Sequence, residues 1–364
     1  MTDFNEKQLK ELADSAIDRD LAEHDISALE GDLALENIFY ALPPEERKNT
    51  GQVRDKWLSK YDHIRKHGGL AFYGVDPLTG ERTECISFKP NQPISPDRKY
   101  EQPPKSENQA FYPAVTDRIW QLTSEIFGAP MPTDKDQTYW LWVMEQQIPI
   151  IITEGCKKAL SVMSQGYPAI ALTGIWNGVI ANRDENGETT SYKLIPSLYP
   201  FLGEAKIYIA FDRDQKAGTI KKVIQARSVL AKKLIEIGCQ CYSMPWDSET
   251  KGLDDLIVSG GVDALKLSIA NAQELTGEAP NFKKRPVANI LAETIAKEWK
   301  DRIHYDTKTK CWRVYKGGIW DSITPDDMEQ AVYRRVVQDA PEVASSNYIA
   351  NITTFLRWIL TAEK

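Results

Sequence analysis

The sequence predicts an α/β protein whose central parallel sheet is flanked by helices. Four short apolar runs, each bounded by turn residues, are typical of strands buried on both faces. These strands are expected at 149–153, 168–173, 206–211 and 239–244. Helical patterns between them begin near Cys156, Thr219 and Val262. The alternation of strand and helix indicates parallel strands joined by right-handed crossovers, and it defines a domain over residues 148–272.

The preceding region, residues 1–147, is expected to be an α+β accessory region. Residues 6–66 are polar, with apolar side chains such as Leu9, Leu12 and Ile17 at helical spacing. Two strand-like runs follow at 70–74 and 85–88, and an Asp-Pro-Leu-Thr-Gly turn lies between them. A proline-rich stretch after the second run predicts an extended surface loop.

A linker over residues 273–290 is expected to lead into a small α+β module over residues 291–364. The module begins with a helix at 287–300, and a second helix starts near Pro325. Strands are expected between them, around 302–306, 311–315 and 319–321. Trp312, Tyr315 and Trp320 are expected to form the core of this small sheet. Stacking of the three rings on nucleic-acid bases is the alternative.

Composition argues against several classes of protein. The 364 residues carry a net charge of −7, which argues against a surface that coats nucleic acid but allows local basic patches. The five cysteines are scattered without a C-x-x-C pair, so neither a zinc ribbon nor a disulfide framework is expected. The start of the chain lacks the pattern of a signal peptide, and no apolar stretch approaches the roughly 18 residues that span a membrane. A cytoplasmic location without a membrane partner is therefore the expectation.

Carboxylates follow two of the predicted strands at the point where each strand ends. Glu154 follows the first strand, and Asp212 and Asp214 follow the third. The carboxyl ends of parallel strands meet at one edge of a sheet, where ligand sites collect. Carboxylates and retained waters are the ligands that Mg²⁺ prefers, and Mn²⁺ accepts them too. The pattern therefore predicts a metal site for phosphoryl or phosphodiester chemistry, with helix capping and turn formation as the alternatives for each acid.

Several cations and one glycine near the same edge are candidates for binding phosphate or nucleic acid. Lys157 and Lys158 fall in the first turn of a predicted helix, where cations oppose the helix dipole unless an anion binds there. Gly174 follows the second strand and allows a close approach of phosphate to the backbone. Lys221 and Lys222 lie on the polar face of the helix at 219–237. An exposed, solubilising pair is the alternative for Lys157 and Lys158.

A second acidic pair, Asp254 and Asp255, follows the last predicted strand. Either side chain can join the metal site or cap the helix that begins there, and capping is favoured for one of the two. The four histidines lie outside the sheet region, so a histidine-based nucleophile or metal centre is not expected. The sequence also contains neither a P-loop motif nor a G-x-S-x-G elbow.

Together these residues resemble a toprim domain, the metal-binding fold of bacterial-type primases, topoisomerases and some nucleases. The resemblance lies in Glu154-Gly155, Lys157-Lys158-Ala159-Leu160, Gly174 and Phe211-Asp212-Arg213-Asp214. A toprim-like family of plasmid, phage and cyanobacterial replication proteins is more similar still, and the likeness covers most of residues 9–272. Its motifs are Ile152-Thr153-Glu154-Gly155, Gly174-Ile175-Trp176-Asn177, Trp246-Asp247 and Gly252-Leu253-Asp254-Asp255-Leu256. Residues 291–325 resemble, more loosely, the segment that leads into the helicase part of phage and plasmid primase-helicases.

The resemblance implies a role for each acidic residue. Glu154 would be the general acid or base, with Lys157 and Lys158 as further catalytic candidates, while Asp212 and Asp214 would hold Mg²⁺. The chain departs from the toprim pattern after Asp214, because Ala217-Gly218 comes one residue late. It also lacks the zinc ribbon of bacterial-type primases and a recognisable separate polymerase core.

Three functions are compatible with this sequence. The first is a primase component of a mobile-element replication protein, which uses single-stranded DNA and nucleotides. Its helicase or ATPase module would act in trans or be missing from this chain. The second is a nuclease, in which the same acids direct water. The third is a non-catalytic module that binds DNA or recruits a helicase through residues 291–364.

Overall fold

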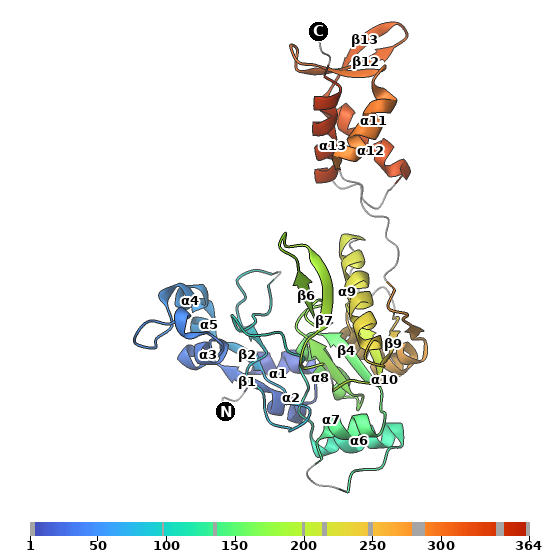
Figure 1. Ribbon diagram of the computed structural model, residues 1–364. Coiled ribbons are helices and arrows are strands. Elements are labelled where there is room, and N and C mark those ends of the chain that lie inside the picture. Colours follow the sequence, from blue (N-terminus) through green and yellow to red (C-terminus); the bar gives the residue numbers. More distant parts are fainter. Residues whose placement is uncertain are drawn as a thin grey trace. The chain divides into compact units, whose positions relative to one another are not determined.

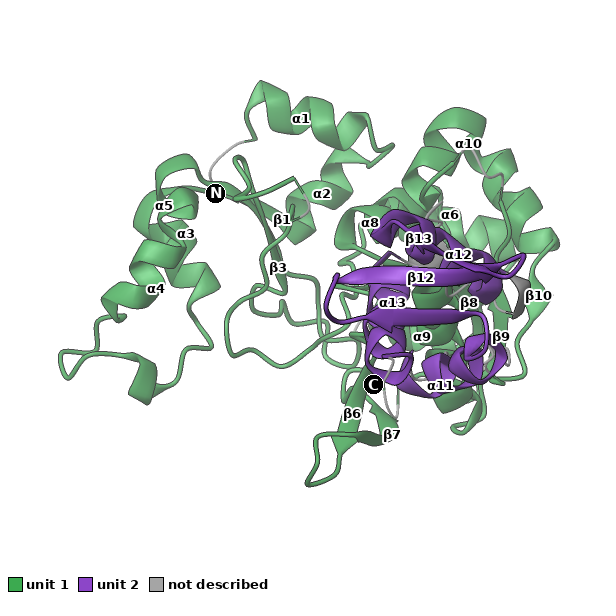
Figure 2. Cartoon of the chain, turned by 90° about the horizontal axis from the view of Figure 1, so that it is seen from above, with its two compact units in different colours: residues 1–280 green, residues 281–364 purple. Residues whose placement is uncertain are grey.

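The fold was analysed in a computed structural model that describes residues 4–96, 98–133, 137–198, 201–212, 217–246, 250–278, 288–339 and 346–361. The chain divides into two compact units, Met1–Pro280 and Asn281–Lys364 (Figure 2). The predicted linker at 273–290 begins with a short strand, and its residues 279–287 lie outside the described residues. Among the helices that the structure describes, none combines the length and apolar character that a membrane crossing requires.

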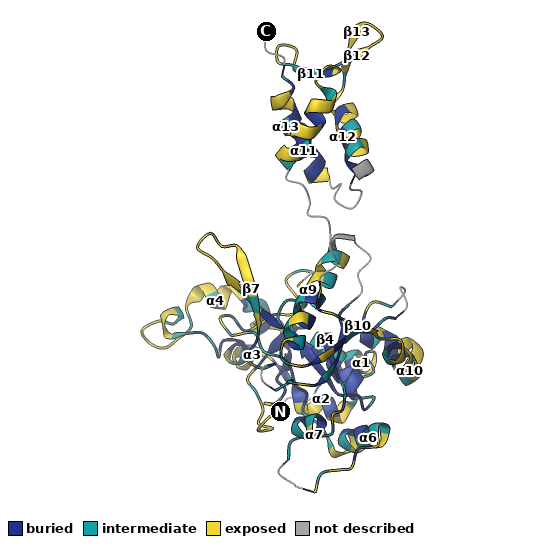
Figure 3. Ribbon diagram, turned by 45° about the vertical axis from the view of Figure 1, so that its right-hand side comes forward, coloured by how far each residue is buried: buried dark blue, intermediate teal, exposed yellow. Residues whose placement is uncertain are grey.

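A five-stranded sheet forms the centre of the first unit (Figure 1). Its strands, in spatial order, are β10 (Gln273–Glu274), β9 (Gln240–Ser243), β8 (Lys206–Ala210), β4 (Ile150–Glu154) and β5 (Ala169–Leu172). The four predicted strands are all present and parallel to their neighbours, whereas β10 is a short antiparallel addition that was not predicted. The residues of β4 are buried as far as Thr153, as expected for a strand covered on both faces (Figure 3). The structure thus confirms the α/β fold class.

Helices cover both faces of this sheet. α8 (Cys156–Met163) connects β4 to β5, and α9 (Ala217–Ile235) connects β8 to β9. The two crossovers run in opposite directions along the sheet, so right-handed connections place the helices on opposite faces. α10 (Leu253–Ala270) packs against α8. It is broken at Gly261, where φ is 63°, so the helix predicted to begin near Val262 is its second half.

The N-terminal region combines helices with a three-stranded antiparallel sheet. The sheet contains β1 (Ile26–Leu29), β2 (Gly69–Phe72) and β3 (Ser87–Pro90). The helices are α1 (Glu6–Ala13), α2 (Arg19–Asp25), α3 (Gly31–Ile38), α4 (Asp55–Lys60), α5 (Asp62–His67), α6 (Asp117–Phe127) and α7 (Tyr139–Glu145), with a 3₁₀ turn at Pro44–Glu46. The helical spacing of apolar residues over 6–66 did not indicate β1, because these four residues form a strand only by pairing with the distant β2.

The N-terminal region and the central sheet share one hydrophobic core. Phe111 exchanges two backbone hydrogen bonds with Ala171 in β5, at N···O distances of 2.8 and 3.0 Å. Trp140 and Trp142 of α7 are both buried in this core, and their indole N–H groups donate to the carbonyl oxygens of Pro113 and Pro130. The accessory region is therefore packed onto the edge of the sheet that carries β5.

An exposed hairpin follows β5 and was not predicted. Its strands are β6 (Val179–Arg183) and β7 (Thr189–Leu194), and Figure 1 shows them projecting beyond the sheet. Most of their residues are polar and exposed, so the alternation that marks a half-buried strand is absent. Trp176, just before the hairpin, stacks on Tyr192 with ring centroids 5.9 Å apart.

The second unit is a small α+β module, as predicted. It consists of α11 (Ala288–Trp299), a meander of β11 (Ile303–Asp306), β12 (Cys311–Lys316) and β13 (Ile319–Ile323), then α12 (Pro325–Asp339) and α13 (Ser346–Ile359). Its core contains Ile295, Trp312, Val332 and Ile352. Trp312 is in the core as predicted, but the prediction was wrong for Tyr315 and Trp320, which are 45% and 40% exposed.

Candidate active site

Glu154 and Asp212 lie at the same edge of the central sheet. β4 and β8 are adjacent parallel strands, paired with Thr153 opposite Ala210. Glu154 is the last residue of β4, and Asp212 comes two residues after the end of β8. The register of β4 and β8 brings the ends of both strands to the same edge of the sheet. The two acids therefore lie near each other, as predicted.

Burial sets the electrostatics of both carboxylates. It raises the pKa of Glu154, and the negative charge of Asp212 raises it further, while Lys158 and Lys251 act in the opposite direction. Burial likewise raises the pKa of Asp212, and Asp254 adds to this, while Lys158 and Lys251 counteract it. Two acids with raised pKa values at a strand edge are typical of a functional site.

Lys158 forms an ion pair with Asp212. It comes from the first turn of α8, and its Nζ lies 3.2 Å from Asp212 Oδ2. Both side chains are about four-fifths buried, with exposed fractions of 20% and 21%. Burial alone would lower the pKa of Lys158, but Asp212, Asp254 and Glu154 outweigh it and raise the pKa overall. Lys158 is thus a protonated cation held inside an acidic cluster.

Asp212 also has an unused oxygen. Its Oδ1 atom is buried and finds no hydrogen-bond partner among the described residues. Gly252, which precedes α10, comes close to this oxygen. A Cβ atom at Gly252 would lie 3.2 Å from Asp212 Oδ1, 2.9 Å from Asp254 Oδ1 and 2.5 Å from Lys158 Cε. The acidic cluster therefore consists of Glu154, Asp212 and Asp254 around Lys158, and Gly252 leaves room for it.

Asp254 and Asp255, the second acidic pair, have different surroundings. The Asp255 carboxylate accepts a hydrogen bond from the Gly252 backbone N–H at 3.2 Å, so Asp255 caps α10. Asp254 instead acts on the charges of the cluster, since it raises the pKa values of both Asp212 and Lys158. The sequence did not indicate which of the two acids caps the helix. The backbone N–H of Gly252 shows that it is Asp255.

Asp214, predicted as a metal ligand, lies outside the described residues. Within the described ranges, no three His, Cys, Asp or Glu side chains are arranged to hold a metal ion. The described part of the site brings together Glu154, Asp212 and Lys158, and the metal-binding role of the acids stays a prediction.

Lys157 points away from the acidic cluster, toward the N-terminal region. Its Nζ lies 2.7 Å from Glu11 Oε1, and Lys89 pairs with the same oxygen. Burial alone would raise the pKa of Glu11, but the hydrogen bonds and charges of the two lysines lower it overall. Glu11 also lines a pocket of about 280 Å³ together with Lys7, Lys89 and Lys99. We call it the basic pocket; Glu11, on its wall, is the residue that also pairs with Lys157 of α8.

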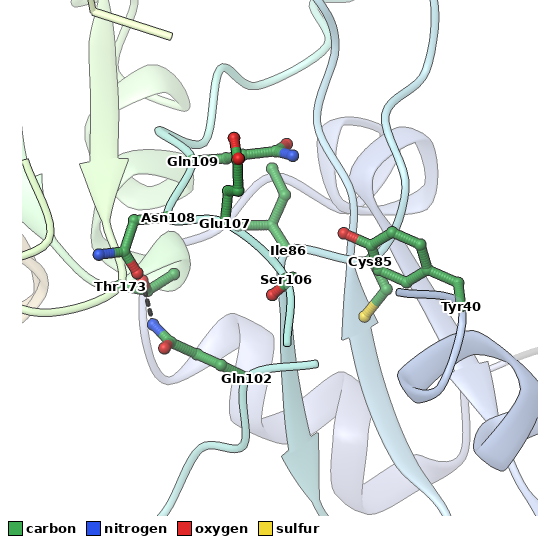
Figure 4. A pocket seen from close by; sticks show the side chains of 9 residues that line it. All are labelled: Tyr40, Cys85, Ile86, Gln102, Ser106, Glu107, Asn108, Gln109 and Thr173. Carbon is green, nitrogen blue, oxygen red and sulfur yellow. Dashed lines mark hydrogen bonds between the residues drawn. The ribbon is translucent and has the colours of Figure 1, made fainter. Parts of the chain in front are cut away.

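The remaining phosphate-binding candidates are Gly174, Lys221 and Lys222. Gly174 forms a turn in which its carbonyl accepts a hydrogen bond from Asn177 N–H at 2.9 Å. Thr173, beside it, hydrogen-bonds Gln102 and faces a small polar pocket that Asn108 and Glu107 also line (Figure 4). Lys221 and Lys222 lie in the first turns of α9, which follows the carboxyl end of β8.

The sequence prediction missed three residues that shape the site. Glu11 was not predicted because it lies 146 positions from Lys157, and a lone acid on a polar helix carries no signal of a distant partner. Lys251 and Gly252 precede the second acidic pair, and their role depends on a loop that returns to the end of β8. A glycine immediately before an acidic helix start was the available signal for Gly252.

Residues 139–264 match a family described as a domain of unknown function, DUF3854. The match runs from the start of α7 into α10 and therefore includes the acidic cluster. An uncharacterized protein of Picosynechococcus sp. (strain PCC 7002) is 34% identical over 261 residues, which is 69% of this chain. The chain spans only 26% of the length of that relative, so the activity of the longer protein is not transferred to this chain.

Solved structures of DnaG-type primases share a limited likeness with this chain. A DNA primase domain from Pseudomonas aeruginosa gives a TM-score of 0.43 at 13% identity, covering 98% of this chain and 90% of that chain. A DnaG primase catalytic domain bound to single-stranded DNA gives 0.42 at 12% identity, covering 96% and 89%. The zinc-binding and RNA polymerase domains of the Aquifex aeolicus primase give 0.39 at 13% identity, covering 97% and 67%. Likeness at this level carries no conclusion about activity.

Proposed function

We propose that this chain is a toprim-like primase component of a mobile-element replication protein. It would perform metal-dependent phosphoryl transfer on single-stranded DNA. The observation that carries the proposal is the acidic cluster at the carboxyl edge of β4 and β8, in which Glu154 and Asp212 are brought together by neighbouring strands. The motif resemblance to toprim domains runs through the same residues.

One carboxylate oxygen of the acidic cluster is available to a hard divalent cation such as Mg²⁺ or Mn²⁺. The buried Oδ1 of Asp212 has no hydrogen-bond partner among the described residues, and a buried carboxylate oxygen of this kind is a ligand for such a cation. Asp212, with Glu154 and Asp214 as the other candidates, would hold the ion. Bound there, the cation would stabilise the charge that develops on a transferring phosphoryl group.

Glu154 is the candidate for moving a proton. Its pKa is raised by burial and by Asp212, and a carboxyl group with a raised pKa exchanges protons closer to neutral pH than an ordinary one. Lys158 holds a positive charge beside the same edge, and Lys157, Lys89 and the basic pocket offer further cations to phosphate groups. These cations are local, so they are compatible with the negative net charge of the whole chain.

Primer synthesis on a single-stranded template tests the proposal directly. The full chain is incubated with template, nucleotides and Mg²⁺ or Mn²⁺, and labelled products are resolved by size. Glu154→Gln should abolish product without lowering the melting temperature of the chain. Asp263→Asn is the matched control, because Asp263 is 90% exposed and lies on α10. Full primer synthesis by Glu154→Gln would refute the assigned role.

Cation binding is measured separately from activity. Mg²⁺ or Mn²⁺ is titrated against wild type, Asp212→Asn and Asp263→Asn, with the shift in melting temperature as the readout. We expect wild type and Asp263→Asn to be stabilised by the cation and Asp212→Asn to lose most of this effect. Equal stabilisation of all three proteins would exclude Asp212 as a ligand.

A non-catalytic DNA-binding module is the second candidate, because Lys158 already pairs with Asp212. A nuclease on the same scaffold is distinguished in the same assay. Cleavage of single-stranded DNA with Mg²⁺ and without nucleotides would favour the nuclease. DNA binding without either reaction, unaffected by Glu154→Gln, would favour the non-catalytic module.

A further inference from the structure

The meander of the second unit has one face in the core and one face open. Side chains alternate along a strand, so Trp312 and Val314 of β12 pack into the core while Arg313 and Tyr315 lie on the opposite side. His304 pairs with Arg313 across the β11–β12 ladder, and Trp320 pairs with Tyr315 across the β12–β13 ladder. We call His304, Arg313, Tyr315 and Trp320 the open aromatic face.

The three rings of this face contact one another rather than the core. The His304 and Trp320 ring centroids are 4.3 Å apart, and those of Tyr315 and Trp320 are 5.2 Å apart. Tyr315 and Trp320 are 45% and 40% exposed, and neither belongs to the core cluster of the described part of the unit. A tryptophan and a tyrosine held side by side on a sheet surface expose apolar ring area that folding of this unit does not use.

The surroundings of the open aromatic face are basic, although the chain as a whole is acidic. Five cationic side chains lie on the described segment 301–323, namely Arg302, Lys308, Lys310, Arg313 and Lys316. The segment has three acids, Asp301, Asp306 and Asp321. One of these acids is paired with a cation of the same segment, because Asp306 lies 3.8 Å from the Arg313 guanidinium. Arg313 is also held in place by Ser322 Oγ at 2.7 Å.

We propose that the open aromatic face binds single-stranded DNA by stacking bases on Trp320 and Tyr315. Arg313 and the lysines of the β11–β12 and β12–β13 turns would contact the phosphates. Aromatic side chains inside a positively charged surface are the combination that binds single strands without reading sequence. A protein partner is less suited to this face, because an apolar docking surface is depleted in lysine at its centre.

The proposal is independent of catalysis, and only the choice of DNA over RNA rests on the proposed function. It predicts a second DNA-binding surface, carried by residues 303–323 rather than by the acidic cluster. The Glu154→Gln substitution should therefore abolish primer synthesis without changing DNA binding by this surface. Binding is measured with a protein that cannot react, so the two proposals fail by different observations.

The test is an equilibrium titration of a labelled oligothymidine of about 12 nucleotides, a length within the range that one binding surface covers. The full chain with Glu154→Gln is compared with the same chain carrying Trp320→Ala or Tyr315→Ala. We expect each alanine to weaken binding at least about fivefold, the lower end of what one stacking side chain contributes. Trp320→Phe keeps a ring at this position and should retain most of the affinity.

Trp358→Ala is the matched control. Trp358 is 62% exposed, lies on α13 and is not one of the residues of the open aromatic face, so its removal should change the affinity less than about twofold. Salt separates the two kinds of contact. The loss caused by Arg313→Ala should shrink as salt is raised, because phosphate contacts weaken, while the loss caused by Trp320→Ala persists.

Several results would overturn the proposal. Wild-type affinity in both Trp320→Ala and Tyr315→Ala would do so, as would an equal loss in Trp358→Ala. If the alanine variants bind DNA normally but elute as a smaller species in gel filtration, a second copy of the chain occupies the face instead. The ligand would be RNA rather than DNA if a uridine oligonucleotide bound more tightly than the thymidine one and the same variants lost this binding.

Discussion

Lys158 Nζ lies 3.2 Å from Asp212 Oδ2, so the first turn of α8 is joined by an ion pair to the end of β8. The pair is largely buried, and Glu154 and Asp254 add negative charge around the lysine. Lys158 and Lys251 thus act against the negative charges of this cluster, in a space that Gly252 keeps open. A divalent cation or a phosphate group that binds in the acidic cluster would therefore compete with the ion pair between Lys158 and Asp212.

The ion pair predicts strong coupling between Lys158 and Asp212. Lys158→Met and Asp212→Asn should each change the free energy of unfolding, and the coupling in a double-mutant cycle should reach about 1–2 kcal/mol, because each partner leaves a largely buried charge behind. Urea unfolding of the four proteins measures it. The control cycle is Lys233 with Glu236, a more exposed pair at 2.6 Å, for which about 0.2–0.5 kcal/mol is expected. Equal coupling in the two cycles would contradict the prediction.

Glu154→Gln should stabilise the protein at neutral pH while removing activity. The raised pKa means that the folded state holds the Glu154 proton more tightly than the unfolded state does. Stability of the wild type therefore falls as pH rises from the unfolded pKa, about 4.3, through the raised folded pKa. The glutamine variant lacks this fall and should be about 0.5–2 kcal/mol more stable above that window. Melting temperatures from about pH 4 to 8 test this, and parallel curves for the two proteins would refute it.

Gly252→Ala should impair the site without unfolding the chain. The backbone at Gly252 has φ −129°, which alanine adopts freely, but the new Cβ would lie 2.5 Å from Lys158 Cε and 2.9 Å from Asp254 Oδ1. Displacement of Lys158 should lower the rate of primer synthesis at least about tenfold, since small misplacements of reacting groups are costly. Single-turnover rates and the cation-induced melting shift measure the effect. A variant with the wild-type rate and cation response would show that the close approach has no functional role.

Glu11→Gln should weaken folding and strengthen binding to single-stranded DNA. The lowered pKa of Glu11 means that its contribution to stability is present above the unfolded pKa, about 4.3, and is lost as pH falls through the folded pKa. At neutral pH the variant should lose about 1–2 kcal/mol of stability. Lys157 and Lys89 are then released toward the basic pocket, so DNA affinity and its salt dependence should rise.

Glu236→Gln, which removes an acid from a surface pair at the end of α9, is the control for Glu11. It changes the net charge by the same amount without touching the basic pocket. A general charge effect would raise DNA affinity equally in both variants. An increase confined to Glu11→Gln would place the phosphate contacts near Lys157 and Lys89.

The central sheet was predictable because its signal is local. An apolar run such as 150–153 can be buried only if helices cover both of its faces, and parallel neighbours then bring Glu154 and Asp212 to one edge. The hairpin of β6 and β7 was not predictable in this way, because its polar, exposed strands have no buried face to leave a pattern. Tyr315 and Trp320 were wrongly predicted to be in the core. An aromatic residue gives the same sequence signal whether its ring is buried in a core or exposed on a sheet surface.

Local sequence patterns were therefore enough to predict the four parallel strands of the central sheet and the acids that follow two of them. Those features depend on periodicity within short segments. Three contacts could be read only from the folded chain: Lys158 pairs with Asp212, Lys157 pairs with Glu11, and Asp255 caps a helix while Asp254 acts on the charges of the cluster. Each of these depends on which distant segments pack together, and the energy of a charge depends on the neighbours and the burial that packing gives it.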